Sequence, residues 1–224
     1  MAPNGEDPRY RWVLFDLDGT LTDPGVGITR CAADALRRCG YRAPAPEALC
    51  WIVGPPLRET FATLAGTSDR AMIDALMAAY RERFVPVGIY ENTVYPGIPD
   101  VLAACAARGQ TLALATSKPT VFAREILRHF GLAPHFTAVV GSYLDGRRSN
   151  KAAVIRHALR LLGAQPSKTA MVGDRRHDRL AAQACGVTAI GAGWGYAPPG
   201  ELEACGPAAL CGSPPDLDAV LRAR

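Results

Sequence analysis

The stretch RWVLFDLDGTLTD (residues 11–23) places a run of four apolar residues directly before two aspartates, Asp16 and Asp18. The apolar run predicts a buried β-strand over residues 12–16. Ionised carboxylates are costly to bury without a partner, so this strand end needs positive charge or hydrogen-bond donors. Side chains at positions i and i+2 of a strand point the same way, and both carboxylates could then reach one pocket that holds a divalent cation. The alternative is a pair of turn aspartates that cap the next segment.

Four further apolar runs predict strands, and helical patterns lie between them. The runs are continuous rather than alternating, which is typical of parallel strands covered on both faces. The alternation of strands and helices predicts a doubly wound α/β fold with a parallel sheet. Sheets of this kind bind ligands beyond the carboxyl ends of their strands. The predicted strands are 12–16, 111–117, 137–142, 170–174 and 187–193, and the predicted helices are 97–109, 118–131, 149–163 and 176–186.

Residues from about 23 to 92 break this alternation. Several segments with helical spacing follow one another there, with no convincing strand between them. Pro- and Gly-rich stretches precede and follow the block, at Pro24-Gly25 and at 95–99. We therefore expect an α-helical cap over residues 23–92, hinged to a catalytic core made of residues 1–22 and 93–224.

Composition excludes several classes of function. There is no run of about 18 apolar residues, so no membrane span is expected, and the first ten residues lack the apolar centre of a secretory signal. Seven scattered cysteines without a CxxC pair indicate reduced thiols and a cytoplasmic location. The net charge is only +4 and the arginine doublets are scattered, which disfavours nucleic-acid binding. We expect a monomer or a weak homodimer.

The ends of the later strands add groups suited to a phosphate or a metal ion. Residues 116–118 (Thr-Ser-Lys) offer hydroxyl and backbone donors at a predicted helix start, although helix capping explains the hydroxyl equally well. Asp174 ends the fourth strand and Asp178 follows four residues later; alone, they could be a helix cap and a first-turn charge. Lys151 opens the helix after the third strand, where a lysine is commonly solvated. Their order on successive strand ends predicts one phosphate and metal site.

Four motifs resemble those of the haloacid dehalogenase superfamily. They are FDLDGTLTD (15–23), LALATSKP (112–119), SNKAAVI (149–155) and MVGDRRHD (171–178). The layout, with a helical cap between the first motif and the second strand, is similar to the phosphoglycolate-phosphatase-like branch of that superfamily. The resemblance runs from about residue 11 to residue 222.

This resemblance implies a Mg²⁺-dependent phosphomonoester hydrolase that acts on a small phosphorylated metabolite through an aspartyl-phosphate. Asp16 is the implied nucleophile. Asp18 is the implied general acid and then the general base. The resemblance also implies that Mg²⁺ is held by the Asp16 carboxylate, the Asp18 carbonyl and Asp174, and that Asp178 lies beside them or touches a metal-bound water. The implied phosphate-binding groups are Thr116, the Ser117 amide and Lys151.

Two departures from the branch concern the substrate. Arg175 stands where many members have a small hydroxyl residue, and His177, expected on a helix surface, precedes Asp178. Ala152 follows Lys151, so the usual Lys-Pro pair is missing. Together with GSYLDGRRSNK (141–151), these features resemble a 5′-nucleotidase-like subgroup.

A phosphatase is the expected activity within the superfamily. Asp18 argues against the dehalogenase reaction, and the lack of any lysine before Lys118 argues against a Schiff-base mechanism in the cap. Phosphoglycolate is the first expected substrate and a nucleoside 5′-monophosphate the second. A sugar phosphomutase and a non-catalytic binding protein remain alternatives.

Several residues have two open interpretations. Arg58 either contacts an anionic part of the substrate or is an exposed helix arginine. Trp51 and Tyr90 either line a substrate pocket or pack between cap and core. The segment GWGY (193–196) follows the last predicted strand, where we expect a loop near the pocket mouth.

Overall fold

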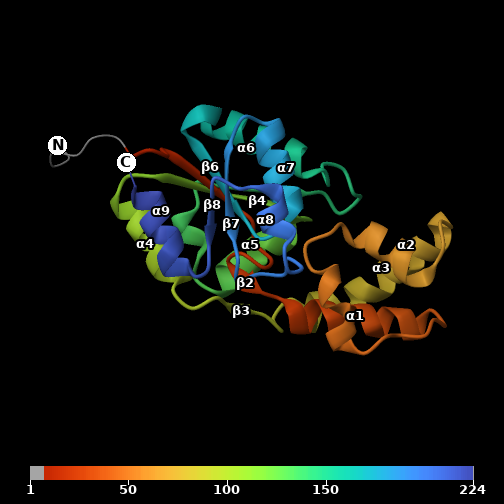
Figure 1. The fold of residues 1–224 in the computed structure, drawn as a ribbon. Helices are drawn as coiled ribbons and strands as arrows, with labels where there is room; N and C mark the ends of the chain where they lie inside the picture. Colours follow the sequence, from red (N-terminus) through yellow and green to blue (C-terminus); the bar gives the residue numbers. More distant parts are fainter. Residues whose placement is uncertain (1–7, 224) are drawn as a thin grey trace. The chain divides into compact units, whose positions relative to one another are not determined.

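The computed structural model describes residues 8–223, which group into two compact units (Figure 1). The core unit comprises the chain up to Leu21 and from Tyr95 onward, and the helical unit comprises Thr22–Val94. Residues 1–7, on which the expectation about a secretory signal depends, and residue 224, the last of the predicted core, lie outside the described residues. Within residues 8–223, every helix is too short or too polar to span a bilayer.

The core unit contains a six-stranded sheet in the order β5-β4-β1-β6-β7-β8, and every neighbouring pair in it is parallel. This confirms the predicted doubly wound α/β fold. The strands are β1 (Trp12–Phe15), β4 (Thr111–Pro119), β5 (Ala138–Ser142), β6 (Thr169–Gly173), β7 (Thr188–Ala192) and β8 (Ala209–Cys211).

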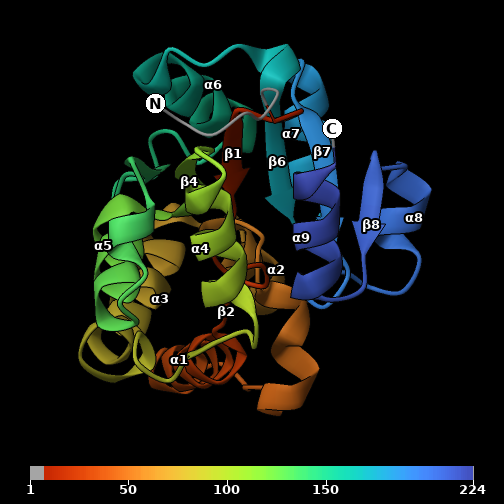
Figure 2. The same ribbon diagram turned by 90° about the vertical axis from the view of Figure 1, so that its left-hand side faces the viewer.

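Helices cover both faces of this sheet (Figures 1 and 2). On one face, Leu14 of β1 and Met171 of β6 are fully buried against Ile155 and Ala182 from two helices. These helices are α6 (Lys151–Leu162) and α7 (Arg176–Ala184), and the short α8 (Glu201–Cys205) packs beside α7. The opposite face carries α4 (Ile98–Ala107), α5 (Thr120–His129) and α9 (Pro214–Arg222).

The strand order positions the functional site. From β1 the core continues to β4 and β5 on one side of the sheet, whereas β6 leads to β7 and β8 on the other. The direction therefore reverses between β1 and β6, and ligands of such sheets bind beyond the carboxyl ends of the strands at this point. Asp16 and Asp174 directly follow these two strands.

Both ends of α6 are set by capping interactions. Asn150 is the N-cap residue, and its side chain accepts a hydrogen bond from the Ala153 N–H at 3.2 Å. At the other end Gly163 adopts a left-handed conformation with φ of 59°, which a residue without a Cβ adopts at little cost. Both ends of the helix are therefore set by local sequence, and Lys151 is fixed as its first residue.

The end of β4 differs from the prediction. The strand continues to Pro119 and α5 begins only at Thr120, so residues 116–118 do not lie at a helix start. Proline disfavours the helical conformation in the residue before it, which keeps Lys118 extended. The register between β4 and β5 also shifts between Ala115 and Pro119. The expected helix start at residues 116–118 is thus wrong, and these residues form an irregular strand end. Their role toward phosphate stays a prediction.

The helical unit consists mainly of helices. Phe61, Tyr80 and Phe84 form its aromatic centre, with ring centroids 6.0 Å and 5.1 Å apart for successive pairs. Two residues at each end of the unit form a short antiparallel ladder that the sequence does not predict. The elements are β2 (Thr22–Asp23), α1 (Gly25–Arg38), the 3₁₀ segment η1 (Pro46–Ile52), α2 (Leu57–Ala65), α3 (Arg70–Arg83), the π-helical turn η2 (Phe84–Gly88) and β3 (Thr93–Val94).

Three candidate substrate contacts lie in the helical unit. Trp51 and Tyr90 expose 41% and 42% of their surface. Arg58 is exposed and forms an ion pair with Asp74 of α3. Their roles toward a substrate stay predictions.

Candidate active site

Asp16 is held at the boundary between β1 and β6. Its backbone N–H donates to the Val172 carbonyl of β6 at 2.9 Å, and its Oδ1 accepts from the Leu17 N–H at 2.8 Å. The carboxylate is buried, with 6% of the residue exposed. Since β1 ends at Phe15, the prediction that Asp16 and Asp18 share a strand is wrong. A tight turn carries Asp18, in which the Leu21 N–H donates to the Leu17 carbonyl at 2.9 Å.

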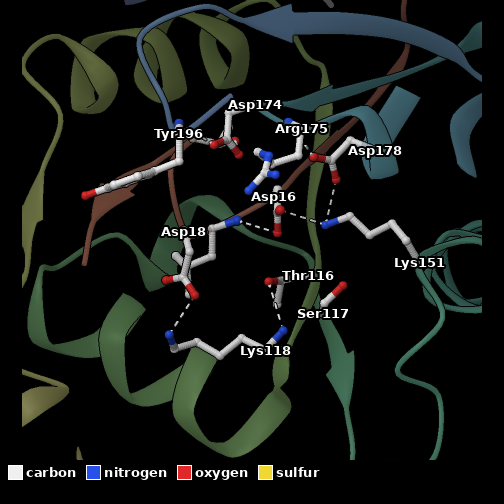
Figure 3. Close-up of polar contacts among 12 residues, drawn as sticks. Asp16, Asp18, Thr116, Ser117, Lys118, Lys151, Asp174, Arg175, Asp178 and Tyr196 are labelled. Atoms are coloured by element: carbon white, nitrogen blue, oxygen red, sulfur yellow. Dashed lines mark hydrogen bonds and ion pairs between the residues drawn. The ribbon is translucent and has the colours of Figure 1, made fainter. Parts of the chain in front are cut away.

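Lys151 bridges two carboxylates of the site (Figure 3). Its Nζ lies 2.8 Å from Asp16 Oδ2 and 2.8 Å from Asp178 Oδ1. Burial opposes the charged form of this ammonium group, but Asp16 and Asp178 outweigh burial and raise the Lys151 pKa to about 12. Lys151 is therefore a buried cation, and the solvated interpretation is wrong.

Lys118 makes the corresponding contact with Asp18, and this pair is not among the predicted site contacts. Its Nζ donates to Asp18 Oδ2 at 2.7 Å, and both residues are buried. Burial raises the Asp18 pKa, and Lys118 acts in the opposite direction. Within residues 8–223, the other oxygen, Oδ1, is buried without a hydrogen-bond partner. Two sequence features bear on Lys118: it is one of three lysines in the chain, and it lies in the motif LALATSKP (112–119).

Asp174 and Asp178 complete an acidic cluster with Asp16. One carboxylate oxygen from each of the three lies within 4.8 Å of the others, and all three residues are buried. Burial, together with Asp178 and Asp16, raises the Asp174 pKa well above its ordinary value. Burial also raises the Asp178 pKa to about 6, although Lys151 opposes this shift.

Two glycines make room for these carboxylates. A Cβ on Gly173 would lie 2.2 Å from the Asp178 Cγ, and a Cβ on Gly19 would lie 2.1 Å from Asp174 Oδ2. Gly19 also has a φ of +80°, which disfavours any side chain. Close packing within the site therefore requires a glycine at position 19, after Asp18, and at position 173, before Asp174.

The charges of the cluster fit a divalent cation. With all of its groups ionised, the cluster has two more negative than positive charges, and burying such an excess is costly. Carboxylate oxygens are the ligands that Mg²⁺ prefers. The Asp18 carboxylate points to Lys118, which agrees with a ligand role for its carbonyl rather than its side chain. The groups counted are the carboxylates of Asp16, Asp18, Asp174 and Asp178 and the ammonium groups of Lys118 and Lys151, whereas the buried Arg175 is paired with Glu201.

Thr116 and Ser117 lie at the end of β4 in the same group of residues (Figure 3). Thr116 is buried, and its hydroxyl oxygen accepts from the Lys118 N–H at 3.2 Å. The Ser117 carbonyl accepts from the Ser142 hydroxyl of β5 at 2.8 Å. Both residues are thus held by contacts with strand ends, and their role toward phosphate stays a prediction.

The residues after Asp174 have structural roles. Arg175 is the N-cap residue of α7, so Asp174 is not a helix cap. The Arg175 side chain is buried and its Nε donates to Glu201 Oε1 at 2.9 Å. His177 is exposed, as predicted.

Comparison with known proteins gives the following matches. Residues 13–192 match the model of the haloacid dehalogenase-like hydrolase family. The chain is 47% identical over 213 residues to a 5′-nucleotidase of Pseudomonas aeruginosa, covering 95% of this chain and 96% of that protein. It is 41% identical over 192 residues to the tyrosine-protein kinase PtkA of Mycobacterium tuberculosis. This match covers 86% of this chain and 64% of that protein.

More distant and structural relatives agree with the family match. A phosphoglycolate phosphatase of Chromobacterium violaceum is 32% identical over 197 residues, covering 86% of this chain and 89% of that protein. The solved structure of a predicted phosphatase from Clostridium acetobutylicum has a TM-score of 0.91 and 38% identity, covering 95% of this chain and 98% of that one.

Proposed function

The chain belongs to the haloacid dehalogenase-like hydrolases and is a phosphatase, and we propose that it hydrolyses small phosphomonoesters with Mg²⁺ through a phosphorylated Asp16. The observation that carries this proposal is the buried cluster at the β1–β6 boundary, in which Lys151 bridges Asp16 and Asp178 and carboxylate oxygens of Asp16, Asp174 and Asp178 lie within 4.8 Å of one another. The non-catalytic alternative is set aside because the chain is a phosphatase.

Asp16 is the proposed nucleophile. Its Oδ forms a bond to phosphorus while the bond from phosphorus to the leaving oxygen breaks. The Lys151 ammonium, 2.8 Å from Asp16 Oδ2, favours the ionised carboxylate and offsets its repulsion from the phosphate. Water then attacks the phosphoryl group, which releases inorganic phosphate and restores Asp16.

Asp18 is the proposed proton donor and acceptor. Burial raises its pKa, so its protonated form is more populated than in an exposed aspartate. Lys118 holds Oδ2, which leaves the unpartnered Oδ1 to carry the proton that passes to the leaving oxygen. The resulting carboxylate then accepts a proton from the attacking water.

We propose Asp16, Asp174 and the Asp18 carbonyl as Mg²⁺ ligands, with Asp178 beside them. The bound cation would supply positive charge that stabilises the transferring phosphoryl group. The Thr116 hydroxyl, the Ser117 amide and Lys151 are the groups proposed to bind the phosphoryl oxygens.

Removing the Lys118 contact should affect chemistry more than binding. We expect Lys118→Met to lower kcat by about 100-fold, the lower range for loss of a general acid or base, with a smaller change in KM. The apolar side chain has similar length but leaves Asp18 without its partner. Steady-state kinetics with para-nitrophenyl phosphate measures this effect.

Lys168→Met, at an exposed lysine, is the matched control and should stay within about twofold of the wild type. A Lys118→Met variant whose kcat falls by less than about threefold would contradict the role given to the Lys118–Asp18 pair.

A nucleoside 5′-monophosphate is the first proposed substrate. The 47% identity to a 5′-nucleotidase, against 32% to a phosphoglycolate phosphatase, reverses the order expected from the sequence alone. The departures at Arg175 and Ala152 point the same way. A phosphomutase stays an alternative. We also keep the expected cytoplasmic location and the monomer or weak homodimer as proposals; all seven cysteines are free thiols.

A substrate panel tests this proposal. We expect kcat/KM for nucleoside 5′-monophosphates to exceed that for phosphoglycolate by about 10-fold or more, which corresponds to about 1.4 kcal/mol of transition-state binding. Nucleoside 3′-monophosphates are the matched control for recognition of the 5′ position. A preference for phosphoglycolate would contradict this proposal and agree with the substrate order expected from the sequence alone. Isomerisation of glucose 1-phosphate without phosphate release would indicate a mutase.

A further inference from the structure

The loop Gly193–Tyr196, which follows β7, packs against the acidic cluster although it contributes no carboxylate. The Tyr196 N–H donates to Asp174 Oδ2 at 2.8 Å. A Cβ on Gly195 would lie 2.3 Å from the Asp174 Cβ and 2.3 Å from the Gly19 carbonyl oxygen. The loop backbone therefore lies directly on Asp174, at a distance that admits no side chain.

Trp194 connects the same loop to the turn that carries Asp18. Its indole Nε1 donates to the Thr20 carbonyl at 3.1 Å. The Thr20 hydroxyl in turn donates to Asp174 Oδ1 at 3.3 Å. These contacts form a closed path from Trp194 through Thr20 and Asp174 to Tyr196. The loop thus links the turn after β1 to the carboxylate after β6.

The position of Trp194 is fixed from a second side. The rings of Tyr95 and Trp194 meet edge to face with centroids 6.5 Å apart. The Tyr95 N–H also donates to the Leu21 carbonyl at 3.1 Å, at the end of the same turn. Trp194 is therefore held between the turn and the chain that returns to the core unit.

This arrangement orders Asp174 before any ligand arrives. Asp174 is fully buried, and each of its oxygens accepts a hydrogen bond from a different segment. Groups that hydrogen-bond to a metal-binding carboxylate orient it, and their loss typically lowers metal affinity by about 10- to 100-fold. A carboxylate fixed in this way loses little freedom on binding a cation.

We propose that Gly193–Tyr196 is a positioning loop that sets the affinity of the site for its divalent cation. Trp194 fixes the Asp18 turn, and Gly195 with the Tyr196 amide fixes Asp174. The proposal rests on the proposed function, because it takes the acidic cluster to be the cation site. It assigns no contact with substrate to the loop.

Calorimetric titration with MgCl₂ tests the proposal on the whole chain. We expect Trp194→Phe, which keeps a ring against Tyr95 but loses the N–H, to raise the Mg²⁺ dissociation constant by about 10-fold, and Gly195→Ala by up to about 100-fold. Trp12→Phe, at the opposite end of β1 from Asp16, is the matched control and should stay within about twofold. At saturating Mg²⁺, Trp194→Phe should regain most of the wild-type kcat with KM for para-nitrophenyl phosphate unchanged.

A second measurement uses the fluorescence of Trp194 itself. In the Trp12→Phe/Trp51→Phe double variant, Trp194 is the remaining tryptophan, and its emission should change saturably with Mg²⁺ at the midpoint found by calorimetry. This variant keeps the positioning loop intact, so it decides the question even if Trp194→Phe does not fold.

The outcomes separate the two proposals. A wild type that binds no Mg²⁺ would overturn the proposed function. A wild type that binds Mg²⁺, with Trp194→Phe and Gly195→Ala variants of equal affinity or a Trp194 emission that does not respond, would overturn the positioning role alone. Lower thermal stability with unchanged Mg²⁺ affinity would show a purely structural loop and would also reject the proposal.

Discussion

Asp16→Asn should lower kcat by about 10⁴-fold or more, because an amide cannot replace the carboxylate as nucleophile; loss of a nucleophile in other enzymes has effects of this size. The change removes one negative charge from a cluster that has an excess of them, so the variant should stay folded. Lys151 keeps its contact with Asp178 at 2.8 Å. Phosphate release from para-nitrophenyl phosphate measures the loss, and circular dichroism confirms the fold.

A covalent readout complements the kinetics. Brief incubation of the wild type with ³²P-labelled substrate followed by acid quenching should label the protein, and Asp16→Asn should stay unlabelled. Asp145→Asn is the matched control, since Asp145 is exposed and pairs with Arg147. Retention of a tenth or more of wild-type activity by Asp16→Asn, or labelling of that variant, is incompatible with a phosphorylated Asp16.

Lys151→Met should combine the largest loss of stability with a loss of activity. The substitution leaves Asp16 and Asp178 buried without their shared cation, and breaking a buried ion pair costs about 3–5 kcal/mol. Urea unfolding without divalent cation should show this decrease in the free energy of unfolding. The variant should also lose about 100-fold or more in kcat/KM, since the nucleophile and the phosphoryl group lose the same positive charge.

Lys168→Met again provides the control, because that lysine is exposed and should change stability by less than about 0.5 kcal/mol. Added Mg²⁺ should restore part of the stability lost in Lys151→Met, since a cation at the cluster neutralises the same carboxylates. A Lys151→Met variant as stable as the wild type without divalent cation would show that the pairs contribute no net stability.

Local patterns predicted the strand ends that carry Asp16 and Asp174. Both residues directly follow continuous apolar runs. Such runs are typical of parallel strands that are buried on both faces. The strand β8, with only Ala209–Cys211, was missed because three residues between Gly- and Pro-rich stretches carry no period. The predicted end of β4 is wrong because Pro119 keeps Lys118 extended, and the apolar pattern of the strand carries no sign of this effect.

The partners of the site residues were harder to predict. Lys118 meets Asp18 across 100 positions of sequence, and Thr20 meets Asp174 across 154. Such pairs arise only when the sheet brings β1, β4 and β6 together, and a single sequence contains no record of that proximity. The loop at 193–196 could be placed near the pocket by its location after a strand, but its contact with Asp174 depends on the absence of a side chain at Gly195.

The hydrogen bond between Tyr95 and Leu21 has an evolutionary consequence. It joins the residues on either side of Thr22–Val94 at 3.1 Å, so the core unit closes on itself whatever the length of the intervening segment. Doubling the length of a flexible connection costs only about 0.6 kcal/mol in closure entropy. A lineage can therefore exchange this segment for a longer, shorter or unrelated one while keeping the carboxylates of the core unit unchanged, so the helical unit and the acidic cluster can vary independently.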